Sequence, residues 1–277
     1  MNKILITGCN GQLGTELGLL LPNAVKTDKD DLDITDENAV RDFVQKNNID
    51  IIINCAAYTA VDKAEDDVAS AQKINVDGPR NLAKSGAKII HISTDYVFDG
   101  TGHKPYTPDD ATNPVSVYGK TKLAGELAVL ENADIAVVIR TAWLYSPYGN
   151  NFVKTMLRLG AEKSELNVVS DQIGTPTYAA DLAKAVVAIL PQLNKENSGV
   201  YHFTDEGVCS WYDFATEIMT MAGLQCNVRP IPSSAYPTRA TRPHYSVLDK
   251  SKIKQVFGVE IPHWRKSLKA CLKELGI

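Results

Sequence analysis

The sequence predicts an α/β fold, with a doubly wound parallel sheet and a smaller C-terminal subdomain. Short apolar runs alternate with amphipathic stretches through the first half of the chain, which is typical of strands joined by crossover helices. A glycine-rich turn follows the first apolar run directly, as in Rossmann-type sheets. The second half is less regular and contains a proline-rich stretch, which indicates a cap of helices and loops over the sheet.

Five strands are expected in the first half, since each stretch is short, apolar and followed by turn residues. The run Ile51-Ile52-Ile53 does not alternate with polar residues, which favours a parallel strand buried on both faces. The expected strands are Lys3–Thr7, Ala24–Thr27, Ile49–Asn54, Lys88–Ser93 and Ile135–Arg140. The helices expected between them are Gln12–Leu20, Glu37–Gln45, Asp66–Lys84 and Val117–Leu130.

In the second half, apolar residues at helical spacing predict further helices. A capping-box pattern begins one of them at Ser210, and Gly223 stops it. The four prolines between Pro230 and Pro243 predict a loop. The other expected helices are Asp181–Leu193, Asp249–Gly258 and Trp264–Leu275.

Composition and charge exclude several classes of function. The chain has 277 residues and a net charge of −4 without a basic block, so nucleic acid is not an expected partner. Its apolar runs are too short to span a bilayer, and its first residues do not read as a secretory leader. The five cysteines are scattered, which favours reduced thiols and a cytoplasmic protein. The spacing of cysteines and histidines predicts no metal site.

The glycine-rich turn carries the spacing G-x-x-G-x-x-G, at Gly8, Gly11 and Gly14. Glycines allow a tight turn and bring the backbone close to a pyrophosphate, while the following helix start offers amide donors. The spacing is a variant of the usual dinucleotide fingerprint, and alone it is a weak signal because such a turn can also be a simple chain reversal. Its place between a strand and a helix predicts a dinucleotide cofactor.

The identity of that cofactor, NADPH or NADH, stays open. Asp28 ends the second expected strand, where an acid usually holds the ribose 2′-hydroxyl of NADH. Lys29 follows at once and could accept the 2′-phosphate of NADPH. Asp33 and Ile34 lie where the adenine is expected. A solvated acidic loop is the alternative for this stretch.

A tyrosine and a lysine four residues apart, Tyr118 and Lys122, point to carbonyl reduction. Residues at this spacing share a helix face, so the ammonium can stabilise the phenolate, lower the pKa of the tyrosine and reach the nicotinamide ribose. Thr94, just past the fourth expected strand, can hold the carbonyl oxygen with its hydroxyl. The Tyr/Lys pair alone often occurs by chance; together with Thr94 and the glycine turn it predicts a hydride-transfer site.

The chain resembles the extended short-chain dehydrogenase/reductase family. The shared motifs occur in the family's order along essentially the whole chain: T-G-x-x-G-x-x-G from Thr7, N-C-A-A-Y-T from Asn54, N-V-D-G from Asn75, S-T-D-Y-V-F-D-G from Ser93 and Y-G-K-T-K from Tyr118. The resemblance implies a dinucleotide-binding Rossmann domain over residues 1–145, joined by 172–197 and 244–260. It also implies a substrate-binding subdomain from residues 146–171, 198–243 and 261–277.

By this resemblance, Tyr118 is the proton donor, Lys122 its partner and cofactor ligand, and Thr94 the third catalytic residue. Thr94, Asp95 and Trp143 would contact the substrate, with Asn151 and Arg242 as further candidates. Trp143 could instead be a core aromatic, and Arg239 could replace Arg242 as a cation for a diphosphate. The cofactor would lie against Gly8, Gly11, Gln12, Leu13, Gly14, Asp28, Asp33, Ile34, Ala56, Ala57, Tyr58, Thr59, Tyr118 and Lys122.

Within the family, the chain is similar to the branch that reduces dTDP-4-dehydrorhamnose (dTDP-6-deoxy-L-lyxo-4-hexulose) to dTDP-L-rhamnose. The implied partner is therefore a dTDP-sugar, and the implied pathway is polysaccharide biosynthesis. The narrower similarity rests on seven stretches: Gly11–Gly14, Ala56–Asp62, Ser93–Phe98, Arg140–Trp143, Gly149–Phe152, Asp171–Pro176 and Arg242–Pro243.

One departure concerns assembly. Some members of the branch form a dimer bridged by Mg²⁺ through glutamates, and Glu16 matches one such position. Ala180 stands where another glutamate would be expected. A metal-bridged dimer is therefore not expected, whereas a homodimer of another kind stays open.

Two other functions fit parts of the sequence. A nucleotide-sugar epimerase or another ketoreductase would use the same fold, but a 4,6-dehydratase would need a glutamate after Asp95, where this chain has Tyr96. A non-catalytic regulatory subunit, of the methionine adenosyltransferase type, also resembles these reductases. The intact Thr94, Tyr118 and Lys122 favour an enzyme.

Overall fold

The computed structural model describes residues 2–277, and its centre is a six-stranded sheet in which every pairing is parallel. Five of its strands are those predicted from the sequence. The sixth, at the edge, belongs to a segment that was assigned to the smaller subdomain, so that segment contributes to the sheet. In spatial order the strands are β2 (Val25–Thr27), β1 (Ile4–Thr7), β3 (Ile51–Asn54), β4 (Lys88–Thr94), β5 (Ala136–Thr141) and β10 (Gly199–His202).

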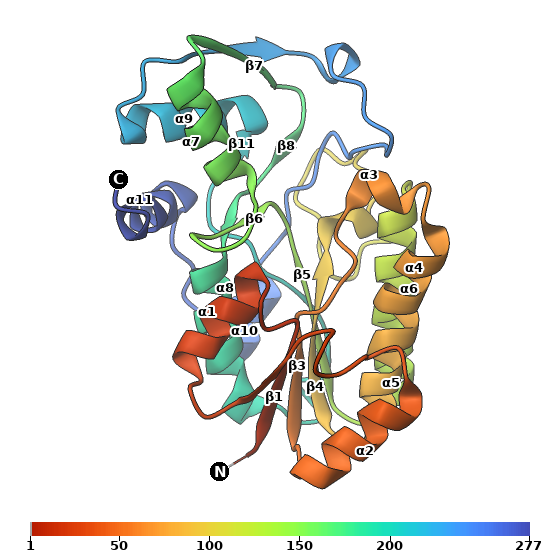
Figure 1. Ribbon diagram of the computed structural model, residues 1–277. Helices are drawn as coiled ribbons and strands as arrows, with labels where there is room; N and C mark the ends of the chain where they lie inside the picture. The colour runs from red at the N-terminus through yellow and green to blue at the C-terminus, as the bar shows by residue number, and fades with distance from the viewer. Residues whose placement is uncertain (1) are drawn as a thin grey trace.

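Helices cover both faces of the sheet, which confirms the doubly wound prediction (Figure 1). Ile51 and Ile53 pack toward one face and Ile52 toward the other, because side chains alternate along a strand. Both faces are buried, so the run has to be apolar throughout. One face is covered by α1 (Gln12–Leu20), α8 (Ala179–Ile189) and α10 (Ser251–Phe257), the other by α2 (Glu37–Asn47), α5 (Gly78–Lys84) and α6 (Val117–Asn132).

The single helix predicted over Asp66–Lys84 is wrong, since the chain there forms α4 (Val68–Gln72), a π-helical turn (Lys73–Asp77) and then α5. Asn75 lies in the turn, and its side chain bonds the backbone of Tyr58 and the hydroxyl of Thr121. Its carbonyl lies against Gly125 so closely that a Cβ there would clash. These tertiary contacts hold an extra residue in the turn, which helical periodicity does not reveal.

A second group of elements, called the smaller lobe here, lies at the upper end of Figure 1. Its core joins aromatic and aliphatic side chains, among them Phe214 and Trp264. The predicted capping box at Ser210 and the stop at Gly223 are confirmed. The lobe is built from α7 (Phe152–Glu162), β7 (Glu165–Val169), α9 (Trp211–Ala222), β12 (Asn227–Ile231) and α11 (Trp264–Glu274).

The loop predicted for Pro230–Pro243 begins instead as a strand, because β12 pairs in parallel with β7 and includes Pro230. Proline is tolerated there since this two-stranded sheet has only edge strands. The described chain contains no helix long and apolar enough to cross a membrane. The remaining short elements are α3 (Val61–Ala64), β6 (Leu144–Tyr145), β8 (Ile173–Gly174), β9 (Thr177–Tyr178), β11 (Cys209–Ser210) and 3₁₀ turns at Asp95–Val97, Leu190–Gln192 and Ser233–Ala235.

Candidate active site

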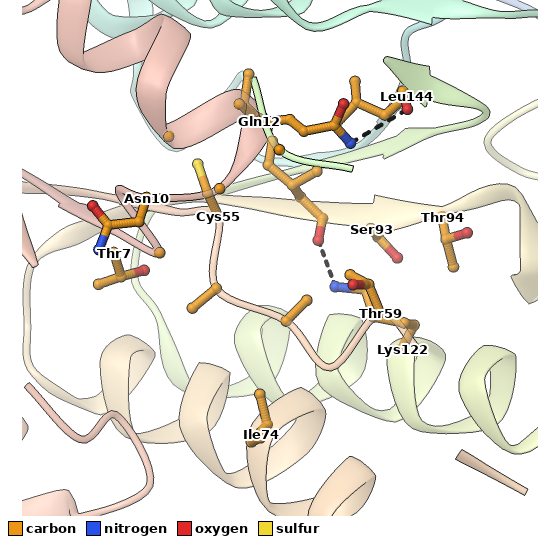
Figure 2. Close-up of a pocket in the computed structure, with 18 of the residues that line it drawn as sticks. Thr7, Asn10, Gln12, Cys55, Thr59, Ile74, Ser93, Thr94, Lys122 and Leu144 are labelled. Carbon is orange, nitrogen blue, oxygen red and sulfur yellow. Dashed lines mark hydrogen bonds between the residues drawn. The ribbon is translucent and has the colours of Figure 1, made fainter. Parts of the chain in front are cut away.

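A cavity of about 1070 Å³ opens at the carboxyl ends of the parallel strands. This is the edge at which α/β sheets bind their ligands. Its walls come from the loops after β1, β2, β3, β4 and β5, so residues far apart in the sequence face one space. Figure 2 shows Thr94 and Lys122 on one side of this space, with Gln12 and Cys55 further along.

The glycine turn forms the first wall. Gly8 has a φ of +65°, and a Cβ there would lie 2.7 Å from the amide nitrogen of Ala56. A Cβ on Gly14 would lie 2.6 Å from the Cα of Cys9. Gly11 is the N-cap of α1 and makes no side-chain hydrogen bond to the helix. The backbone amides at the helix start, which line the cavity, are therefore not capped by a side chain. A pyrophosphate fits this cradle.

Beyond β2, Asp28, Lys29, Asp33 and Ile34 all line the cavity, as predicted for the adenosine end. Asp28 accepts hydrogen bonds from the backbone amides of Asn10 (3.0 Å) and Lys29 (2.8 Å). These bonds fix the carboxylate against the glycine turn.

The residues after β3 divide into two groups. Ala56, Ala57 and Thr59 line the cavity. The hydroxyl of Tyr58 donates to Asp67 (3.3 Å), and its backbone is held by the side chain of Asn75. The structure therefore does not place Tyr58 among the residues that line the cavity.

Thr94, Tyr118 and Lys122 all line the cavity, so the structure brings the predicted catalytic residues together. Lys122 is only 2 % exposed, and its Nζ donates to the carbonyl oxygen of Ile92 (2.6 Å; Figure 2). Thr94 donates its hydroxyl proton to Asp95 (3.0 Å).

The pKa of Tyr118 is shifted in the direction opposite to the one predicted from the sequence. Burial raises the pKa of Tyr118 above its ordinary value of 10, and a hydrogen bond with Thr94 only partly offsets this. Burial also lowers the pKa of Lys122 to about 8, while Glu126 and Cys55 act in the opposite direction. Desolvation of Tyr118 dominates, so its pKa is raised and it is a neutral phenol in the structure, whereas the sequence predicted a pKa lowered by Lys122. A neutral phenol is the form that can give a proton.

The start of α6 aims Tyr118 into the cavity. Ser116 caps the helix by accepting from the Gly119 amide (3.1 Å), and Glu65 accepts from the Val117 amide (2.8 Å). The carbonyl of Tyr96 lies so close to Gly119 that a side chain there would clash. Gly119, the glycine in Y-G-K-T-K, therefore lets the segment that follows β4 pack directly on the helix. Thr94 is the last residue of β4, so this packing brings it close to α6.

The candidate substrate residues are not all in one place. Thr94, Asp95 and Trp143 line the cavity, whereas Asn151 and Arg242 do not. Asn151 caps α7 through the Lys154 amide (3.1 Å) and donates to the Gln12 side chain (3.0 Å).

The two arginines considered for a diphosphate are both paired. Arg242 binds Asp62 (2.6 Å), and Arg239 pairs with Asp66 (2.6 Å) at the surface, outside the cavity lining. Neither arginine lines the cavity, and each guanidinium is paired with a carboxylate of the chain.

Burial raises the pKa of Asp95 to about 6. One of its carboxylate oxygens, Oδ2, is buried without a hydrogen-bond partner. The Ser246 side chain lies near this carboxylate and partly offsets the rise in its pKa.

Sequence reasoning missed two aromatic residues. Trp211 stacks on Trp143 with ring centroids 3.6 Å apart, and Tyr96 lines the cavity beside Tyr118. Trp143 also has a φ of +49°, an uncommon conformation for a bulky residue. Trp211 follows the Ser210 cap and was interpreted only as part of a helix start. Tyr96 was noted as part of a family motif and as evidence against a dehydratase, and no place in the site was predicted for it.

Comparison with known proteins identifies the family. A family model described as the RmlD substrate binding domain matches residues 1–277. The chain belongs to the RmlD family. A dTDP-4-dehydrorhamnose reductase of Aggregatibacter actinomycetemcomitans is 42 % identical over 97 % of this chain and 98 % of that protein. A Bacillus subtilis protein of spore coat polysaccharide biosynthesis is 42 % identical over 99 % of this chain and 98 % of its own length.

Solved structures of RmlD relatives share the fold. The crystal structure of a dTDP-4-dehydrorhamnose reductase from Clostridium acetobutylicum covers 99 % of this chain and 100 % of that one, with 46 % identity and a TM-score of 0.96. The Bacillus anthracis enzyme of the same name, solved in complex with NADP, has 40 % identity, the same two coverages and a TM-score of 0.94.

The metal-bridged arrangement known in some members has one matching residue here. Glu16 is buried in α1 with one carboxylate oxygen unpartnered, and its charged neighbours are Glu274, Asp181 and Lys184. Within residues 2–277, no three His, Cys, Asp or Glu side chains are arranged to hold a metal ion. The absence of a metal-bridged dimer stays a prediction from the sequence, which has Ala180 where a second glutamate would be expected.

Proposed function

We propose that this chain reduces the 4-keto group of dTDP-4-dehydrorhamnose with NADPH or NADH and forms dTDP-L-rhamnose. The observation that carries the proposal is the meeting of Thr94, Tyr118 and Lys122 in one cavity with the glycine cradle. Membership of the RmlD family and the reductases among its relatives support it.

The cofactor would lie along the cavity. Its pyrophosphate fits the cradle of Gly8, Gly11 and Gly14, with Gln12 and Leu13 beside it, and its adenosine extends toward Asp28, Asp33 and Ile34. Ala56, Ala57 and Thr59 would lie beside the middle of the dinucleotide, with Tyr58 behind them. When bound, the nicotinamide supplies the hydride that reaches the sugar C4.

The side chains supply the proton and hold the oxygen. Tyr118, a neutral phenol, gives its proton to the oxygen at C4 as negative charge develops there. The hydroxyl of Thr94, which donates to Asp95 in the structure, would turn to donate to that oxygen. The ammonium of Lys122 would stabilise the phenolate left behind. When the cofactor is bound, Lys122 would also hold its nicotinamide ribose.

For the substrate, Asp95 and Trp143 are the proposed contacts within the cavity. Asp95 would accept a sugar hydroxyl, and Trp143, held by its stacking on Trp211, would offer a flat apolar wall. Asn151 would contact the substrate from its position at the N-cap of α7. Arg242 would bind the diphosphate only if its ion pair with Asp62 were broken.

We place the reaction in the cytoplasm, and the five cysteines, all of which are free thiols in the structure, support that proposal. A homodimer without a bridging metal stays open. An epimerase or another nucleotide-sugar ketoreductase is the main alternative, since the fold and the catalytic residues would serve either.

The test is the fall in absorbance of NADPH, and separately of NADH, with freshly prepared dTDP-4-dehydrorhamnose. We expect turnover with at least one of the two cofactors, and the comparison gives the preference. An epimerase would keep its cofactor bound and show no net oxidation. A protein that binds the cofactor but turns over no nucleotide sugar would contradict the proposal and favour a regulatory subunit.

A further inference from the structure

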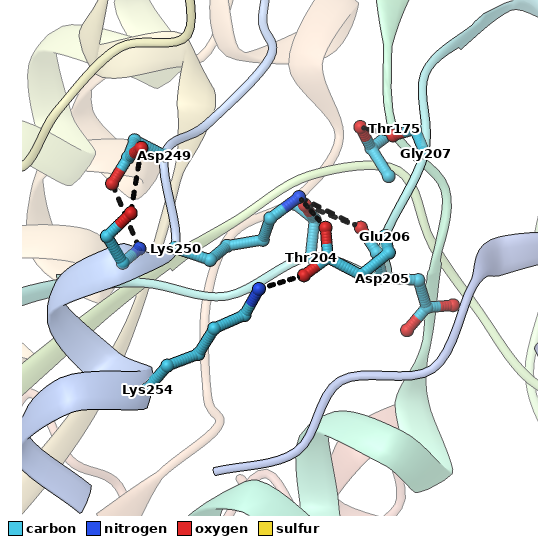
Figure 3. A network of polar contacts seen from close by, with 9 residues as sticks. Thr175, Thr204, Asp205, Glu206, Gly207, Asp249, Lys250 and Lys254 are labelled. Carbon is cyan, nitrogen blue, oxygen red and sulfur yellow. Dashed lines mark hydrogen bonds and ion pairs between the residues drawn. The ribbon is translucent and has the colours of Figure 1, made fainter. Parts of the chain in front are cut away.

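A segment of the chain, residues 236–246, crosses from the smaller lobe to the sheet; we call it the strap. In Figure 1 it is part of the blue chain that descends from the upper lobe toward α3. Beyond the strap, Lys250 bonds the Asp205 carbonyl (3.2 Å) and pairs with Glu206 (3.2 Å), as Figure 3 shows. Before it, Ser233 donates its amide to Asp171 (2.9 Å). Both ends of the strap are therefore fixed.

The centre of the strap is bound to α3 through one carboxylate. Arg242 donates from Nη2 to Asp62 (2.6 Å), and the Ala240 amide donates to the other oxygen of the same carboxylate (3.0 Å). The next residue, Pro243, packs on Gly100, where a Cβ would lie 2.5 Å from the proline Cα. The guanidinium of Arg242 is thus held in one place.

The second amino group of Arg242 reaches the active site. Its Nη1 donates to the hydroxyl of Tyr96 (3.1 Å). The Tyr96 ring meets the Tyr118 ring edge to face, with centroids 5.4 Å apart and planes at 78°. The Tyr96 carbonyl also packs on Gly119, the residue after Tyr118. A continuous series of contacts therefore runs from Asp62 through Arg242 and Tyr96 to the proton donor.

We propose that Arg242 is a positioning residue for Tyr118 and acts through Tyr96. This inference rests on the proposed function and adds to it a link between the smaller lobe and proton transfer. Asp62 neutralises the guanidinium, so the effect of Arg242 on Tyr118 is geometric and not one of net charge. Proton transfer depends on the placement of the phenol, and a small displacement is enough to slow it.

The experiment compares Arg242→Met, Tyr96→Phe and the double variant. Tyr96→Phe keeps the ring against Tyr118 and removes only the hydroxyl that Arg242 binds. Arg239→Met is the matched control, because Arg239 lies in the same strap and pairs with Asp66 but contacts neither tyrosine. For each variant, kcat, KM, the Kd for NADPH and the melting temperature are measured.

We expect Arg242→Met and Tyr96→Phe each to lower kcat about tenfold, with the double variant no worse than either, since both break the same link. KM and the Kd for NADPH should stay near wild type, and Arg239→Met should leave kcat unchanged. Arg242→Lys, which can keep one contact, should restore part of kcat. A raised KM with unchanged kcat in Arg242→Met would instead assign Arg242 to the diphosphate and overturn the proposal.

Additive losses in the double variant, or an equal loss in Arg239→Met, would also overturn it. A readout without substrate separates this inference from the proposed function. In protein with isotope-labelled tyrosine, the ring resonances of Tyr118, assigned with Tyr118→Phe, should shift in Arg242→Met and not in Arg239→Met. Unshifted resonances would refute the positioning role even if the reductase assignment holds.

Discussion

At the scale of the residue, the site combines a phenol kept neutral by burial with a lysine that burial makes easier to deprotonate. The sequence predicted that Tyr118, Lys122 and Thr94 would meet, because helix spacing and strand ends are properties of local pattern. It could not predict the direction in which the pKa of Tyr118 moves, since that depends on how completely the folded chain removes water. Trp211 and Tyr96 were missed for a similar reason: only the tertiary fold brings Tyr96 to the cavity and stacks Trp211 on the cavity residue Trp143.

Replacement of the proton donor gives the first prediction. Tyr118→Phe removes the transferable proton and leaves the ring, so kcat should fall by about 10²–10⁴. The Kd for NADPH, measured by fluorescence titration, should change little. Turnover close to wild type would show that another group supplies the proton.

The second prediction concerns pH. Reduction needs Tyr118 protonated and Lys122 charged, and the pKa of Lys122 is lowered to about 8. As pH rises through that value the ammonium loses its proton, so kcat/KM should fall by about tenfold per pH unit above it. Initial rates from neutral to alkaline pH test this, with the melting temperature followed as a control. A rate that stays level well beyond about pH 8 would mean that the charge of Lys122 is not needed.

The third prediction concerns the cradle. Gly14→Ala would place a Cβ 2.6 Å from the Cα of Cys9, so the turn must shift and the Kd for NADPH should rise about tenfold or more. Gly18→Ala, in the same helix, is the control, because its Cβ would meet only the flexible end of Lys26 at 3.3 Å. Equal affinity in the two variants would contradict the proposed cradle.

At the scale of the element, the parallel sheet and the helices that cover it were predictable, because apolar runs and helical stripes repeat in order. The π-helical turn at Lys73–Asp77 was not, since the contacts of Asn75 with Tyr58 and Thr121 impose it from outside the helix. The strand β12 was not predictable either. Its pairing with β7 makes it a strand, although it contains Pro230, which in the sequence indicates a loop. Local pattern thus gave the framework and missed the elements that tertiary contacts create.

Packing of α1 gives the fourth prediction. Glu16 is 6 % exposed, and burial first, then Glu274, raises its pKa from 4.5 to about 7. The folded chain therefore holds a proton that the unfolded chain loses between these values, so stability is greatest below pH 4.5 and falls as pH rises to about 7. Lys184 and Asp181 also face this carboxylate and act in opposite directions.

Glu16→Gln removes that titration. Relative to wild type, the variant should gain about 1–2 kcal/mol in the free energy of unfolding on going from acidic to mildly alkaline pH, after allowance for solvent screening. Urea denaturation at both pH values measures it. A difference between variant and wild type that does not change with pH would show that Glu16 titrates normally.

At the scale of the whole molecule, the site lies where the sheet meets the smaller lobe. Gln12, in the glycine turn, donates to the Leu144 carbonyl (3.4 Å) and accepts from Asn151 (3.0 Å), which caps the first helix of that lobe. The cofactor cradle and the substrate side are therefore joined through one side chain. The sequence predicted two subdomains, and their boundaries remain a prediction. The place of β10 in the sheet was not predicted, because its pairing with β5 is a tertiary contact that local sequence pattern does not reveal.

The central claim is that a hydride reaches the sugar C4 in a site built by both parts of the molecule. The most direct measurement uses NADPH, or NADH if it is the better donor, fully deuterated at the nicotinamide C4, with dTDP-4-dehydrorhamnose, and follows the product by NMR. We expect dTDP-L-rhamnose with deuterium at the sugar C4. A product that lacks deuterium there, or the absence of any product from protein that binds the cofactor, would contradict the claim.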